Sequence, residues 1–172
     1  MPTRLLMAYA DNVALARVWA GFDRIFEQAG AVVEVRRASE VESVDAYDSV
    51  ILLGPLEGGL WSREAEGFLQ RFRLSLGRMP IAYVVDCALA SSQVRRALRP
   101  LLDAYCEIRP ISILELSSTR IHLDRADAWA KALVPTLIGS PGAGPSGIRP
   151  FLRASRNPPG DLPTSAESRT HR

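Results

Sequence analysis

The chain is poor in the residues that build metal sites and disulfide frameworks. It has two cysteines and two histidines in 172 residues, and Cys87 and Cys106 do not form a CxxC pair. This spacing offers no metal-ligand cluster, and it favours two unpaired thiols over a disulfide. No apolar run reaches the roughly 18 residues of a membrane span, and no signal-peptide pattern opens the chain, so we expect a cytoplasmic location.

Lysine is also nearly absent. Lys131 is the only one, which is typical of an arginine-rich protein from a GC-rich bacterial genome. The formal net charge of the whole chain is +2. From Gly139 onward there are five arginines and two carboxylates, so this tail has a charge of +3 and the body before it a charge of −1. A body of this charge gives little support to nucleic-acid binding.

What the sequence does contain is a series of short apolar runs that read as strands. These runs are residues 4–9, 31–37, 48–53, 80–86 and 110–116. Amphipathic segments between them predict helices. Gly30 is placed to end the first helix, Ser62 to cap the second after a Gly-rich loop at residues 54–61, and Asp124 to cap the last.

This alternation predicts an α/β fold, a three-layer sandwich around a five-stranded parallel sheet with helices on both faces. The first strand and the turn after it carry no GxGxxG dinucleotide fingerprint, which favours the strand order 2-1-3-4-5. The predicted domain covers residues 1–138. Residues 139–172 are rich in Gly, Pro and Arg without periodicity, so we expect a disordered tail.

Three segments carry a family likeness. They are Tyr9 at the end of the first run, AYDSVILLGP at residues 46–55, and GGLWSREAEGFLQRF at residues 58–72. Together they resemble the flavodoxin family, and most of all its short branch, which includes the flavodoxin-like protoporphyrinogen oxidases. The resemblance spans about residues 3–116 and implies a flavodoxin-like fold with FMN at the carboxyl ends of the strands.

The family's first loop usually runs Ser/Thr-x-x-Gly-x-Thr and holds the FMN phosphate at a helix N-terminus. The matching positions here are Asp11, Asn12, Val13, Ala14, Leu15 and Ala16. The loop glycine and both hydroxyls are therefore missing, and Asp11 adds a carboxylate. Two unit negative charges about 4 Å apart, such as the Asp11 carboxylate and a phosphate, repel by about 4 kcal/mol at an effective dielectric of about 20. This repulsion would lower the affinity for FMN by a factor on the order of a thousand. Asp11 also suits a helix N-cap, where it would take the phosphate's place.

Two further loops would flank the flavin ring. The candidate contacts there are Pro55, Leu56, Glu57, Gly58, Trp61, Asp86 and Cys87. Glu57 stands where relatives often place a stacking aromatic, and its charge would disfavour the anionic reduced flavin. Trp61 can stack on a ring or anchor the following helix, and Cys87 can be a reactive thiol or an inert buried one.

The tail contains one better-formed element, IRPFLR at residues 148–153. Its apolar and basic residues alternate as Ile148, Arg149, Phe151, Leu152 and Arg153. Short motifs of this kind dock into a partner's groove and fold on binding, although the segment can also pack on its own domain or have no role.

Several functions are compatible with this sequence. The first is a flavodoxin-like protein that has lost FMN and serves as a non-catalytic scaffold or accessory subunit through protein contacts. The alternative is an FMN-binding redox protein, either an electron carrier or an oxidoreductase. A third is an enzyme that acts on another ligand at the same sheet edge, where open α/β sheets bind their ligands.

Overall fold

The computed structural model describes residues 1–10, 16–57, 60–87, 91–116 and 123–139. The chain divides into two units, Met1–Gly142 and Ala143–Arg172, and the described residues all fall in the first. The boundary at residue 138 and the disordered tail therefore stay predictions.

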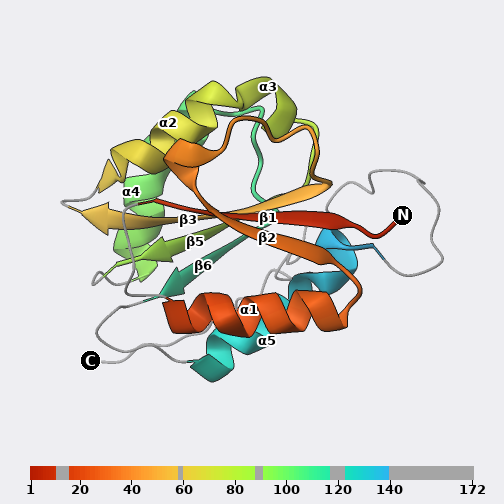
Figure 1. Ribbon diagram of the computed structural model, residues 1–172. Coiled ribbons are helices and arrows are strands. Elements are labelled where there is room, and N and C mark those ends of the chain that lie inside the picture. Colours follow the sequence, from red (N-terminus) through yellow and green to blue (C-terminus); the bar gives the residue numbers. More distant parts are fainter. Residues whose placement is uncertain (11–15, 58–59, 88–90, 117–122, 140–172) are drawn as a thin grey trace, which may run out of the picture. The chain divides into compact units, whose positions relative to one another are not determined.

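A parallel sheet forms the centre of the described unit (Figure 1). Its strands are β1 (Arg4–Tyr9), β2 (Val32–Arg37), β3 (Ser49–Glu57), β5 (Ile81–Asp86) and β6 (Ser112–Leu116). The order β2-β1-β3-β5-β6 confirms the predicted 2-1-3-4-5, because β5 and β6 are the fourth and fifth parallel strands. Every residue of β5 is buried and none of edge strand β2 is, which explains why β5 is a continuous apolar run whereas β2 contains charges.

Helices cover both faces of the sheet (Figure 1). They are α1 (Ala16–Gln28), α2 (Arg63–Arg71), α3 (Arg73–Leu76), α4 (Ser91–Ala104) and α5 (Leu123–Leu137). The helices α1 and α5 lie side by side on one face, where Phe22 meets Trp129 with ring centroids 5.5 Å apart. The helices α2, α3 and α4 cover the other face. Strand residues alternate between the two cores, with Leu5 in one and Leu6 in the other.

Two of the predicted helix boundaries are confirmed. After α1, Gly30 has a φ of +91°, its N–H donates to the Glu27 carbonyl (2.9 Å), and the Ala31 N–H donates to the Phe26 carbonyl (3.0 Å). This is a Schellman ending. At the start of α2, the Ser62 hydroxyl accepts a hydrogen bond from the Glu64 N–H at 3.2 Å.

Other local predictions were wrong. Residues 54–61 are not all loop, because β3 continues to Glu57 and a short strand β4 (Leu60–Trp61) pairs antiparallel with its end. The physical reason is that Leu56 and Trp61, cross-strand partners, are both buried in the core. Asp124 lies inside the first turn of α5 and is not its cap. The predicted second helix is interrupted at Phe72, which separates α2 from α3.

The α2 face has a reduced helical layer near β2. Residues 38–48, all of them described, contain one 3-10 turn, η1 (Ala38–Glu40), and no α-helix. The helix α2 is held beside this turn, which appears in orange next to it in Figure 1. Glu64 accepts hydrogen bonds from Arg37 Nε (3.1 Å) and from the Ser39 N–H (3.0 Å). Arg71 donates to the Ala38 carbonyl (2.6 Å), so α2 is fixed on the β2 side of the sheet.

Candidate functional site

The sheet brings several predicted site residues to one edge. Strand register pairs Pro55 with Asp86 and Asp86 with Leu116, all at the carboxyl ends of their strands. The Cys87 N–H donates to the Leu116 carbonyl at 2.8 Å, which continues the ladder past β5. Pro55, Asp86 and Cys87 thus share the edge at which open α/β sheets bind ligands.

Most of the predicted phosphate loop lies outside the described residues. Asp11, Asn12, Val13, Ala14 and Leu15 belong to this undescribed part, and so does Gly58. Ala16 is the first residue of α1, and Glu57 is the last residue of β3. The predicted tail contacts, Ile148, Arg149, Phe151, Leu152 and Arg153, are likewise outside the described residues.

Trp61 lies in the hydrophobic core. Of the two roles considered for it, stacking on a ring or anchoring the following helix, this burial favours the anchor. Its side chain is 6% exposed, and its ring centroid lies 4.9 Å from that of Tyr83 at a tilt of 55°. The indole fills the notch left by Gly54, where an added Cβ would lie 2.5 Å from Trp61 Nε1 and 2.9 Å from the Ala65 Cβ. A tryptophan held between a strand, a helix and a second ring has little surface left on which a flavin ring could stack.

The other described candidates at this edge are buried as well. Leu56, Asp86 and Cys87 are each 6% exposed, and Pro55 is also buried. Stacking an isoalloxazine ring requires an exposed flat face, preferably aromatic. The described residues of the second and third loops provide none, so they do not fit a flavin ring.

The buried surroundings of Trp61 also leave polar atoms without partners. Among the described residues, Trp61 Nε1 and the Tyr83 hydroxyl have no hydrogen-bond partner. Burial raises the pKa of the Tyr83 phenol well above its usual range. A neutral phenol and a neutral indole in an apolar environment form a packing unit, with no acid–base pair to assign to catalysis.

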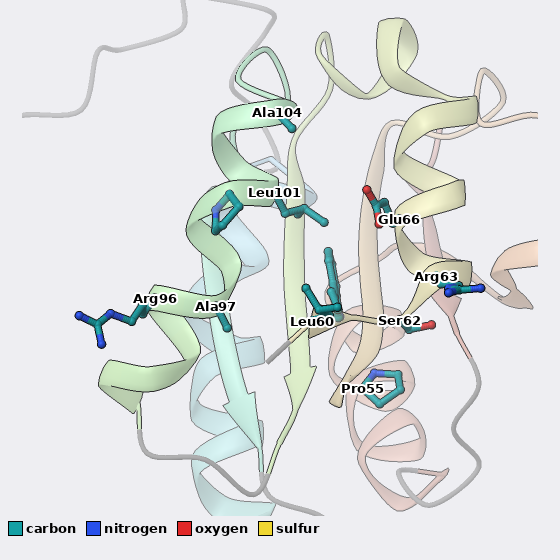
Figure 2. A pocket seen from close by; sticks show the side chains of 11 residues that line it. Pro55, Leu60, Ser62, Arg63, Glu66, Arg96, Ala97, Leu101 and Ala104 are labelled. Atoms are coloured by element: carbon teal, nitrogen blue, oxygen red, sulfur yellow. The ribbon is translucent and has the colours of Figure 1, made fainter. Parts of the chain in front are cut away.

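A groove lies between α2 and α4, beside this packing unit (Figure 2). Its volume is about 820 Å³. It is lined by Pro55, Leu60, Trp61, Ser62, Arg63, Glu66, Arg96, Ala97, Pro100, Leu101 and Ala104. This groove was not predicted from the sequence. The available signal was the small-residue spacing of Ala97, Pro100 and Ala104 on α4, which leaves room along that wall.

A cluster of interacting side chains includes Tyr105, which follows the lining residue Ala104 in the chain. Arg73 pairs with Glu107, and its guanidinium lies 5.7 Å from the centre of the Tyr105 ring. Burial and the nearby Glu66 carboxylate raise the pKa of the Tyr105 phenol. Glu66 therefore belongs to the same cluster, and Figure 2 shows its side chain pointing into the gap between the helices.

The described part of the chain shows no other obvious chemical centre. Within it, no group of three or more His, Cys, Asp or Glu residues could hold a metal ion. Neither Cys87, which is buried, nor Cys106, which is exposed, forms a disulfide. No helix among the described residues is long and apolar enough to cross a membrane.

Sequence comparison gives no assignment, since no family model and no curated protein matches this chain. Solved structures do match. A flavodoxin from Megasphaera elsdenii has a TM-score of 0.64 at 14% identity, over 77% of this chain and 99% of that one. An oxidoreductase from Corynebacterium diphtheriae has a TM-score of 0.59 at 15% identity, over 81% and 100%.

A larger protein contains the same fold as one part. The rubredoxin oxygen:oxidoreductase from Desulfovibrio gigas matches with a TM-score of 0.60 at 13% identity. The match covers 80% of this chain but only 36% of that protein. At such identities the likeness concerns architecture, and function must be argued from the site. Together with the strand order, these matches show that the chain has a flavodoxin-like fold.

Proposed function

We propose that this flavodoxin-like protein does not hold FMN and serves as a non-catalytic accessory or scaffold protein through contacts with another protein. The observation that carries the proposal is the position of Trp61. It is the aromatic residue best placed by sequence to stack on a flavin, and it is packed instead against Gly54 and Tyr83.

The charges at the sheet edge support the same conclusion. Asp86 is buried at the carboxyl end of β5, and the sequence adds Asp11 and Glu57 to that edge. Flavin phosphates are anionic, and the family's phosphate loop uses N–H groups and hydroxyls at a helix N-terminus. Here the hydroxyls are absent and carboxylates are present, so the edge opposes an anion.

The absorption spectrum of the purified protein tests this proposal. We expect no flavin bands in the native protein and no stoichiometric binding when FMN is titrated. The triple substitution Asp11→Ser, Ala14→Gly and Ala16→Thr should increase FMN affinity, because it restores the family's loop chemistry. Stoichiometric flavin in the native protein would overturn the proposal, and an unchanged affinity in the triple variant would overturn its electrostatic basis.

The alternative is an FMN-binding redox protein. It is favoured by the fold, since the structural matches include flavodoxins and oxidoreductases. Backbone N–H groups alone would then have to hold the phosphate. A native flavin spectrum together with reversible reduction by dithionite would establish this alternative.

We propose that residues 139–172 supply a second contact with the partner. Removing them should leave the melting temperature of the domain nearly unchanged and abolish co-purification of a bound protein. A large fall in the melting temperature would show instead that the segment packs on the domain.

A further inference from the structure

We propose that the groove between α2 and α4 is a docking site for a helix of a partner protein, with apolar residues on one face and acidic residues flanking them. The inference deepens the proposed scaffold function, on which it rests, by assigning the partner surface and its chemistry. It concerns residues of the folded domain and is independent of the tail.

The groove is a built feature of the fold. Glu64 and Arg71 tie α2 to η1 on the β2 side of the sheet, while α4 packs beside β4. Residues 38–48 contain no α-helix, and α2 packs against η1 on the β2 side of the sheet. The groove lies on the opposite side of α2, between that helix and α4.

The floor and the α4 wall of the groove are apolar. Leu60, Ala97 and Leu101 point into the gap (Figure 2), and the buried Trp61 also lines the groove. Leu60 is 74% exposed. An exposed leucine beside a concave apolar surface is typical of an interaction site.

The dimensions suit a short helical segment. The α4 wall runs from Arg96 to Ala104, a rise of about 12 Å, or roughly two helical turns. A docked helix would present apolar side chains at i, i+3 or i+4, and i+7 over that length. The volume of about 820 Å³ can hold these side chains.

The basic residues at the rims of the groove favour a partner with acidic residues. Arg63 on α2 and Arg96 on α4 line the groove and extend outward on opposite sides of it (Figure 2). Within the described part of the chain, neither guanidinium has an ion pair or side-chain hydrogen bond. Arg95 adds a third exposed cation on α4. Glu66, the one carboxylate of the lining, belongs to the cluster of Tyr105 and Arg73.

Acidic residues on a docked helix would therefore meet Arg63 on one flank and Arg96 on the other, with the apolar stripe between them. Flanking charges of this kind contribute to specificity and association rate more than to affinity. A basic helix would place like charges against both rims, so the groove should discriminate strongly by sign.

The test uses the full-length protein and fluorescein-labelled synthetic peptides of about four helical turns. One peptide panel has Leu or Phe at i, i+4 and i+7 with flanking Glu, and the second panel replaces each Glu by Lys. Fluorescence polarisation measures affinity, and amide chemical shifts of the ¹⁵N-labelled protein locate the site. We expect the acidic panel to bind at least about tenfold more tightly, with shifts in residues 60–66 and 96–104.

Two variants and two matched controls test the residues. Leu60→Ser should weaken binding about tenfold, and Arg63→Glu combined with Arg96→Glu should remove the preference for acidic peptides together with its salt dependence. Leu74→Ser and Arg78→Glu change equally exposed residues elsewhere, and they should bind like the wild type. All five substituted positions are exposed, so circular dichroism should show folded protein in each case.

Three results of the peptide experiments would overturn the inference. They are equal binding of the two panels, amide shifts outside the groove, and failure of every acidic peptide to bind. Light scattering that shows a dimer abolished by Leu60→Ser would also overturn it, by assigning the groove to a second copy of the chain. The FMN titration is run on the same samples. Flavin binding would refute the proposed function, whereas the peptide titrations test separately whether the groove binds an acidic helix.

Discussion

The phenol of Tyr83 allows a sharp prediction, because a hydroxyl is buried where nothing pairs with it. Its side chain is fully buried, and among the described residues its hydroxyl has no hydrogen-bond partner. A buried unpaired hydroxyl costs about 1–3 kcal/mol relative to water. Deleting one oxygen leaves a small void that cancels part of this gain. We expect Tyr83→Phe to raise the free energy of unfolding by about 1 kcal/mol at pH 7.

The gain should grow in alkaline solution. Burial raises the pKa of Tyr83, so the folded state keeps the phenol proton after the unfolded state has lost it. The contribution to stability is complete below pH of about 10, the usual pKa of tyrosine, and is lost as the pH rises toward the folded value. At a pH of about 11 the wild type should have lost about 1.4 kcal/mol that Tyr83→Phe retains.

Urea unfolding followed by far-ultraviolet circular dichroism at both pH values measures the effect. Tyr47→Phe is the control, because the Tyr47 hydroxyl donates to Glu34 Oε2 at 2.7 Å. Removing that bond should lower the free energy of unfolding by about 1 kcal/mol at pH 7, the opposite sign. A Tyr83→Phe variant that is less stable than the wild type at pH 7 would refute the reasoning, since it would mean that the hydroxyl is satisfied.

Further substitutions test the local structure, each by the same unfolding measurement. Gly54→Ala should cost about 1–3 kcal/mol, because the new methyl group meets Trp61 Nε1 at 2.5 Å, and the tryptophan emission should change as the indole moves. Gly30→Ala should cost about 1 kcal/mol for a different reason: its Cβ would meet no atom within 4 Å, but φ is +91°. Ser62→Ala should cost about 1 kcal/mol, because the Glu64 N–H at the start of α2 loses its acceptor. A loss below about 0.3 kcal/mol at Gly54 would show that Trp61 is loosely held.

The strands of the sheet could be predicted from the sequence because the central strands are buried on both faces. The run at residues 80–86 has a polar residue only at its end, so it reads as a buried strand without any tertiary information. Gly30 and Ser62 were equally clear, since each acts through bonds to residues within four positions. Interactions between residues that are close in the chain determine these helix ends, so the sequence is enough to predict them.

The position of Trp61 could not be decided in the same way. The residues around it fit both a ring-stacking loop and a core anchor. The deciding contacts are with Gly54, across the β3–β4 pair, and with Tyr83 on β5. The groove was missed for a similar reason. It depends on Glu64 reaching Ser39 and on Arg71 reaching Ala38, contacts between segments about 25 to 33 positions apart.

Strand β4 connects the burial of Trp61 with the proposed docking surface. Its two residues point to opposite sides of the pair, as successive strand residues do. When Trp61 enters the core, Leu60 must face the solvent beside α4, and their exposures of 6% and 74% show this alternation. Substitutions at the two positions should therefore have different effects, on stability at Trp61 and on peptide binding at Leu60. Trp61→Ala should cost about 3–5 kcal/mol of stability, whereas Leu60→Ser should leave stability within about 0.5 kcal/mol and change peptide binding alone. If Leu60→Ser lowered stability as much as Trp61→Ala, Leu60 would be part of the core, and the apolar floor of the groove would not be available to a partner.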